Sequence, residues 1–138
     1  MPLFFYHKDR QMDIAKRVNY ESTFEYEVTD PETGAGTGLF LDLRSTSSAE
    51  VKAVSRRHID FISSQQRSNK PVKVETLERQ VIEKLVAAVA SWRWEGDASF
   101  NGDKLDFTPE NVRKVVEVDW IFDQVNKQVG DIENFTKS

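Results

Sequence analysis

The sequence predicts an α+β fold: a mostly helical single domain in which an N-terminal antiparallel β-hairpin packs on the helices. Two segments between residues 23 and 44 alternate apolar and polar side chains, which is typical of half-buried strands. Several later segments repeat apolar residues at spacings of three and four, which is typical of amphipathic helices. A length of 138 residues, with 38% hydrophobic and 30% charged residues, suits one domain with one core.

The hairpin is predicted over about residues 23–44. Residues 30–37 join its two strands, and a proline and two glycines there indicate a turn. Because an isolated hairpin is only marginally stable in water, we expect its apolar face to lie on helices. That face consists of Phe24, Tyr26, Val28, Leu39, Leu41 and Leu43.

Two helices are predicted next, over about residues 48–68 and 75–92. Ser47 and Glu50 fit a capping box at the start of the first, and Pro71 prevents its continuation. The second has such a broad apolar arc that we expect it to be central and buried. Its main stripe is Leu77, Val81, Leu85, Ala88 and Trp92.

Two shorter helices are predicted after a polar turn at Asn101-Gly102, over about residues 109–117 and 120–129. Thr108 is placed to cap the first of them, with Pro109 at its first position. Asp119 is a candidate cap for the second, and Gly130 a candidate stop. The apolar residues around the turn are Trp94, Phe100, Leu105 and Phe107.

The residues that carry chemistry are sparse, and we expect no catalytic residue, cofactor or metal. The chain has no cysteine, which excludes thiolate catalysis, disulfides and cysteine-based zinc sites. His7 has no partner at a recognisable spacing, and His58 lies on an apolar helix face, where a packed structural role is favoured. Residues 97–103 follow half of a calcium loop, but Thr108 stands where a bidentate glutamate is required.

Other partner classes are disfavoured by charge and by pattern. A net charge of −4 argues against a main task of neutralising nucleic-acid phosphates. The glycines of residues 34–38 precede a strand rather than a helix, which favours a hairpin turn over a phosphate-binding loop. The longest apolar stretch, residues 85–91, is too short to span a bilayer, so we expect a soluble, intracellular protein.

Three aromatic residues outside a clear helix stripe are the candidate partner-binding residues: Trp94, Phe107 and Trp120. Trp92 falls on the predicted helix stripe and is assigned to the core. Trp94 either packs under the turn of residues 100–107 or anchors a partner, since tryptophan is enriched at binding hot spots.

The segment from Trp94 to Phe135 resembles the phage tail assembly chaperone family of long-tailed bacteriophages. Members often contain a W-x-G element, then G-x-x-x-x-F-(S/T)-x-E-N, short helices and a terminal N-F. The close match covers about a third of the chain, and the preceding hairpin and two helices are similar in layout. The matching residues here are Trp94-Glu-Gly96, Gly102, Phe107-Thr-Pro-Glu110-Asn111, Trp120 and Asn134-Phe135-Thr-Lys137.

The resemblance implies a non-enzymatic protein that binds the tape measure protein and helps to load tail tube protein around it. It implies the host cytoplasm during phage assembly, or the cytoplasm of a bacterium that carries the prophage, and absence from the mature virion. Members are often also made in a longer, frameshifted form. Homo-oligomer formation is left open, and no family partner site is defined well enough to transfer to residues of this chain.

Two alternatives belong to other classes. One is a structural head–tail or tail-terminator protein that stays in the virion. The other is a small ligand-binding domain or enzyme that uses His58 with a nearby carboxylate; exposure of His58 in a pocket beside an acid would favour it.

Overall fold

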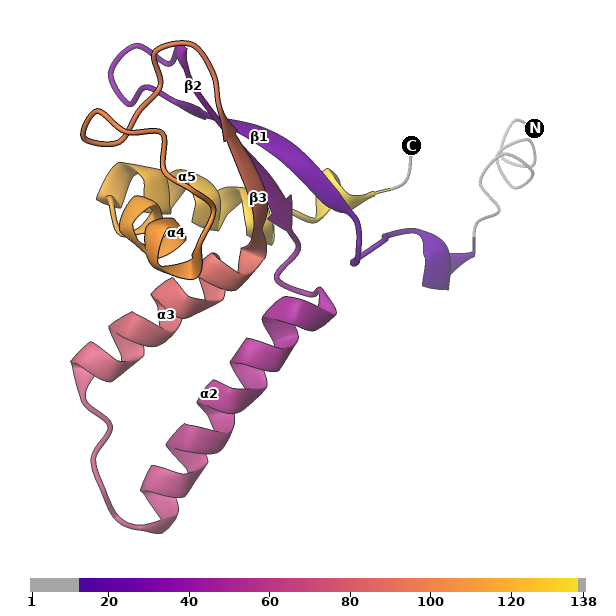
Figure 1. The fold of residues 1–138 in the computed structure, drawn as a ribbon. Helices are drawn as coiled ribbons and strands as arrows, with labels where there is room; N and C mark the ends of the chain where they lie inside the picture. Colours follow the sequence, from indigo (N-terminus) through magenta and orange to yellow (C-terminus); the bar gives the residue numbers. More distant parts are fainter. Residues whose placement is uncertain (1–12, 137–138) are drawn as a thin grey trace, which may run out of the picture.

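The computed structural model describes residues 13–136, and it has the predicted α+β architecture (Figure 1). His7 and Lys137, which entered the sequence predictions, lie outside the described residues. The elements in chain order are η1 (Ile14–Lys16), β1 (Thr23–Thr29), β2 (Gly36–Arg44), α2 (Ala49–Arg67), α3 (Val74–Ala88), β3 (Val89–Trp94), α4 (Pro109–Val116), α5 (Asp119–Gly130) and η2 (Ile132–Phe135).

The predicted hairpin is present as β1 and β2, which pair antiparallel with Tyr26 opposite Leu41. Its turn is shaped by Asp30, whose carboxylate accepts hydrogen bonds from the backbone N–H groups of Glu32 and Thr33 at 2.8 and 3.0 Å. These bonds favour the charged form of the carboxylate and so hold the pKa of Asp30 below its ordinary value. The bond from Thr33 has the largest effect. The alternation is also as predicted, since Leu39, Leu41, Leu43 and Val28 are buried.

The prediction of one helix over residues 75–92 is wrong at its C-terminal end. Helix α3 ends at Ala88, and Val89–Trp94 form a third strand, β3, antiparallel to β2. The sheet order is therefore β1-β2-β3, with Trp92 opposite Leu41 and Trp94 opposite Leu39. The added strand covers the edge that β2 would otherwise expose, which stabilises a hairpin that is marginal alone.

The core lies between this sheet and the helices α4 and α5, which cover one face of it (Figure 1). Gln124 of α5 ties that helix to β1: its side-chain carbonyl accepts from the Tyr26 hydroxyl and the Thr29 N–H, both at 2.9 Å, and its amide donates to the Thr29 carbonyl. The largest fully buried side chains include Leu41, Leu43, Val51, Val112, Val115, Val116, Val125, Val129 and Phe135.

Helices α2 and α3 form an antiparallel pair that extends away from the sheet (Figure 1). Only the ends nearest the sheet reach the core, through Val51 and Val54 of α2 and Leu85 of α3. The expectation that the second helix is central and buried is therefore wrong for its first half. Leu77 and Val81, both on its predicted stripe, are 43% and 45% exposed, so this half of the helix is only partly covered.

The helix ends follow the sequence signals in part. Thr108 caps α4 as predicted, accepting a hydrogen bond from the Asn111 N–H at 3.2 Å. Gly130 is the last residue of α5, also as predicted. The cap of α2 is Ser48 rather than Ser47, and Asp119 lies inside α5 rather than capping it, because Val118 holds the cap position.

Candidate functional site

The aromatic residues after α3 gather into one cluster, which we call the aromatic edge: Trp92, Trp94 and Phe107. The ring of Trp92 lies between the other two, with centroids 5.4 Å from each and interplanar angles of 74° and 83°. Edge-to-face packing of this kind is favourable beyond the area it buries. Two of the three predicted partner-binding residues, Trp94 and Phe107, are thus linked through Trp92. From the sequence, Trp92 was predicted to lie on a helix and in the core.

Trp92 holds the aromatic edge together. Its indole N–H donates to the Leu105 carbonyl at 3.1 Å, which fixes the segment returning from the Asn101-Gly102 turn against β3. The alternation of Trp92, Arg93 and Trp94 between the two faces of β3 brings both indoles to the same side. Period-2 alternation from residue 90 to 94 is the sequence signal that could have identified this role, and the continuing helix stripe masked it.

The third predicted residue, Trp120, lies across a cavity from Trp94. A cavity of about 330 Å³ is lined by both tryptophans together with Phe100 and Val118. Trp120 is 36% exposed and Phe107 is 46% exposed, whereas Trp94 is half-buried. The Trp94 Nε1 atom is buried and has no hydrogen-bond partner within the described protein. The structure therefore brings Trp94 and Trp120 together at one cavity, whereas Phe107 does not line it and is linked to Trp94 only through Trp92.

Residues 95–107 are part of the segment 94–135 that carries the resemblance, and they form a loop closed by a tight turn. Asn101 and Gly102 adopt positive φ angles of 50° and 87°, and Phe100 and Asp103 exchange two backbone hydrogen bonds across them. That is the geometry of a tight two-residue turn. The Lys104 ammonium donates to the carbonyls of Gly96 and Ala98 at 2.9 and 2.8 Å, so the loop's own cation takes these oxygens.

His58 belongs to a cluster that joins three helices. Its Nε2 atom lies 3.1 Å from Oε2 of Glu83 on α3, and the His58 side chain is 13% exposed. The other carboxylate oxygen of Glu83 lies 3.7 Å from Arg79 and 4.0 Å from Arg113 of α4. Glu83 is thus shared among three side chains. This arrangement ties α2, α3 and α4 together. His58 also lines a shallow pocket with Leu77 and Val81, so the acid named in the alternative is present beside it, although the His58 side chain is largely buried.

Residues 13–136 contain neither a cluster of metal ligands nor a helix that could span a membrane. No three His, Asp or Glu side chains converge there as metal ligands. None of the helices in that range combines the length and apolar character that a membrane span requires. No family model, curated protein or solved structure matches the chain.

Proposed function

We propose that this protein is a non-enzymatic bacteriophage tail assembly chaperone that binds the tape measure protein and assists assembly of the tail tube around it. The proposal rests on the resemblance of residues 94–135 to that family. It places the protein in the host cytoplasm during assembly and leaves it out of the finished particle.

Several of the residues shared with the family hold neighbouring segments in place. Phe107 packs on Trp92, Thr108 caps α4, and the Asn111 amide donates to the Asp106 carbonyl at 2.9 Å. At the C-terminus, the Phe135 ring packs edge-on against Phe24 of β1, 5.3 Å away. A family signature made of framework residues fits a protein that binds through a surface rather than one that performs chemistry.

The structural observation that supports the proposal is the exposure of Trp120 at the cavity that it shares with Trp94, together with the exposure of Phe107 on the aromatic edge. Large aromatic side chains that remain exposed next to a pocket are typical of protein-binding hot spots. A tape measure protein is an elongated helical client, and an apolar helix face suits a cavity of this kind. Trp94 supports this surface from below.

The test is binding of the purified chain to fragments of the tape measure protein encoded beside it. The double variant F107A/W120A is expected to weaken binding at least about 10-fold, because truncating a hot-spot aromatic costs about 1–2 kcal/mol or more. I132A is the matched control, since Ile132 is 51% exposed and lies in η2, away from the cavity lining. Circular dichroism and urea denaturation check that each variant is folded.

Two outcomes would overturn the proposal. One is binding that is unchanged in F107A/W120A, or absent for every tape measure fragment with the wild-type chain. The other is stoichiometric recovery of the protein from purified virions by mass spectrometry, because that would assign it to the head–tail or tail-terminator class instead.

A further inference from the structure

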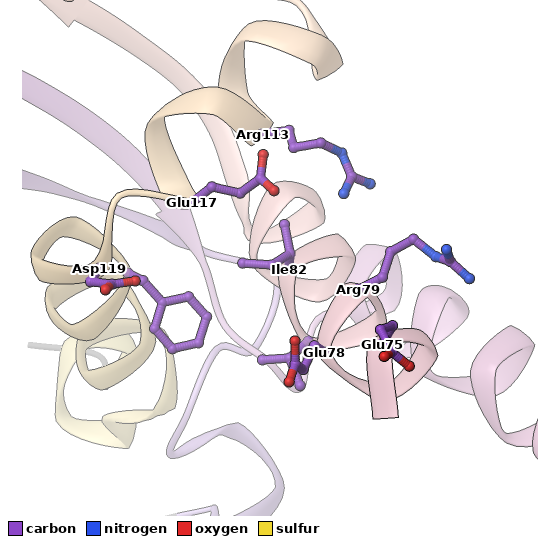
Figure 2. A pocket seen from close by; sticks show the side chains of 9 residues that line it. Glu75, Glu78, Arg79, Ile82, Arg113, Glu117 and Asp119 are labelled. Carbon is purple, nitrogen blue, oxygen red and sulfur yellow. The ribbon is translucent and has the colours of Figure 1, made fainter. Parts of the chain in front are cut away.

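A second surface, separate from the aromatic edge, lies between α3 and the junction of α4 and α5. We call it the acidic groove. It has a volume of about 630 Å³, and its apolar floor consists of Val81, Ile82 and Phe122. Figure 2 shows Ile82 at the centre of the groove, with Asp119 on the far side from α3.

Four carboxylates surround this floor and come from three segments. Glu75 and Glu78 are one helical turn apart on α3, Glu117 follows the last residue of α4, and Asp119 begins α5. All four residues are exposed. Among the described residues, none of these carboxylates lies within 4.0 Å of a basic side chain. The rim of the groove therefore keeps its negative charge.

Two arginines, Arg79 and Arg113, also line the groove. Arg79 and Arg113 both lie on the side of the groove away from Asp119 (Figure 2). Each is within 4.0 Å of Glu83, which is not part of the groove lining. Glu83 thus partly matches their charges. Within residues 13–136 no basic side chain lies within 4.0 Å of the four rim carboxylates, so the lining keeps a net negative charge.

We propose that the acidic groove binds a cationic amphipathic helix of a partner protein. The apolar face of such a helix would cover Val81, Ile82 and Phe122, and lysines or arginines flanking that face would pair with the rim carboxylates. The choice of occupant follows from charge complementarity, because an apolar floor framed by unpaired acids favours a basic partner and repels an acidic one. The inference does not depend on the proposed function.

Because the four acids are exposed, each one contributes only weakly to the binding free energy. An exposed ion pair contributes little by itself and is screened by salt. Several carboxylates placed around one apolar floor act together, so the groove selects charge and orientation while burial of the floor supplies affinity. Binding is therefore expected to weaken as ionic strength rises.

The experiment uses a fluorescein-labelled peptide of about 18 residues, in which leucines at helical spacing alternate with lysines, as the probe. Its binding to the full chain is followed by fluorescence anisotropy. The variant E78K/E117K is expected to weaken binding about 10-fold or more, because two attractions become repulsions. The control E32K/E133K changes the net charge equally at exposed positions outside the groove and should bind within about twofold of wild type.

A second peptide, with glutamates in place of the lysines, should bind at least about 10-fold more weakly than the first. The proposal is overturned if the wild-type chain shows no saturable binding of the lysine peptide, or if E78K/E117K and E32K/E133K lose affinity equally. It is also overturned if F107A/W120A, rather than E78K/E117K, abolishes binding, since the peptide would then occupy the aromatic edge.

Light scattering tests whether the groove serves a second copy of the chain instead. Helix α2 carries Lys52, Arg56 and Arg57, and self-association would use such a face. A dimer that E78K/E117K converts to a monomer would assign the groove to self-association and overturn the proposal. A monomer that binds the lysine peptide supports it. Circular dichroism confirms that each variant is folded.

Discussion

Replacement of Gly38 by alanine should destabilise the protein far more than the same replacement at Gly34. Both glycines have a positive φ, +92° and +76°, which an L-residue adopts at a cost of about 1–2 kcal/mol. Both alanines would also restrict the unfolded chain, which recovers about 0.4–1 kcal/mol. These two effects nearly cancel when the variants are compared with each other, so the comparison isolates the space around each residue.

That space differs sharply between the two positions. A Cβ atom at Gly38 would lie 2.5 Å from the Glu95 carbonyl oxygen and 3.0 Å from Cβ of Ala98, whereas a Cβ atom at Gly34 meets nothing within 4 Å. Glu95 cannot retreat freely, because its N–H donates to the Gly38 carbonyl at 2.8 Å. Overpacking against a fixed neighbour costs about 1–3 kcal/mol, so we expect Gly38→Ala to be about 2 kcal/mol less stable than Gly34→Ala.

Urea denaturation followed by tryptophan fluorescence measures this difference. With a slope of about 1.5 kcal/mol per molar urea, the unfolding midpoint of Gly38→Ala should lie about 1.3 M below that of Gly34→Ala. Midpoints within about 0.3 M of each other would refute the argument, since they would mean that Glu95 moves away at little cost. In that case the close approach of the loop after β3 to β2 would not require a glycine at position 38.

The remaining predictions concern contacts around the aromatic edge and the hairpin. Trp92→Phe should lower the free energy of unfolding by about 1–2 kcal/mol in urea titrations, because it leaves the Leu105 carbonyl without its donor. Thr108→Ala should cost about 1 kcal/mol through the lost cap of α4, and Thr108→Ser should restore most of it; equal losses would contradict a capping role. Asp30 should make stability depend on pH. Hydrogen bonds from Thr33 and Glu32 lower its folded pKa, so its contribution is present above the unfolded value of 3.8 and is lost as the pH falls through the folded value. The stability gap between wild type and Asp30→Asn should therefore narrow in acid, and a gap that stays constant from neutral pH to about pH 2 would contradict this.

Local sequence signals were sufficient to predict the elements whose structure depends mainly on residues close in sequence. The hairpin followed from alternation on both sides of a proline–glycine turn, and the start of α4 followed from Thr108 and Pro109. The cap of α2 moved by one residue because Ser47 and Ser48 are both good caps. Exposure of Leu77 and Val81 could not be predicted in the same way, since it depends on which elements fail to cover α3.

The strand β3 shows where a local pattern and a tertiary constraint compete. Ala88 and Trp92 continue the helix stripe at a spacing of four, while Trp92 and Trp94 also alternate with exposed neighbours at a spacing of two. Pairing with the open edge of β2 decides between them, because a strand there satisfies backbone groups that a longer helix would leave to water.

The formation of β3 in place of a longer helix also creates the candidate site. On a helix, residues 92 and 94 would point about 200° apart, whereas on β3 they share a face and their rings meet 5.4 Å apart. The aromatic edge is thus a consequence of sheet completion, and a binding role for Trp94 and Phe107 depends on that strand.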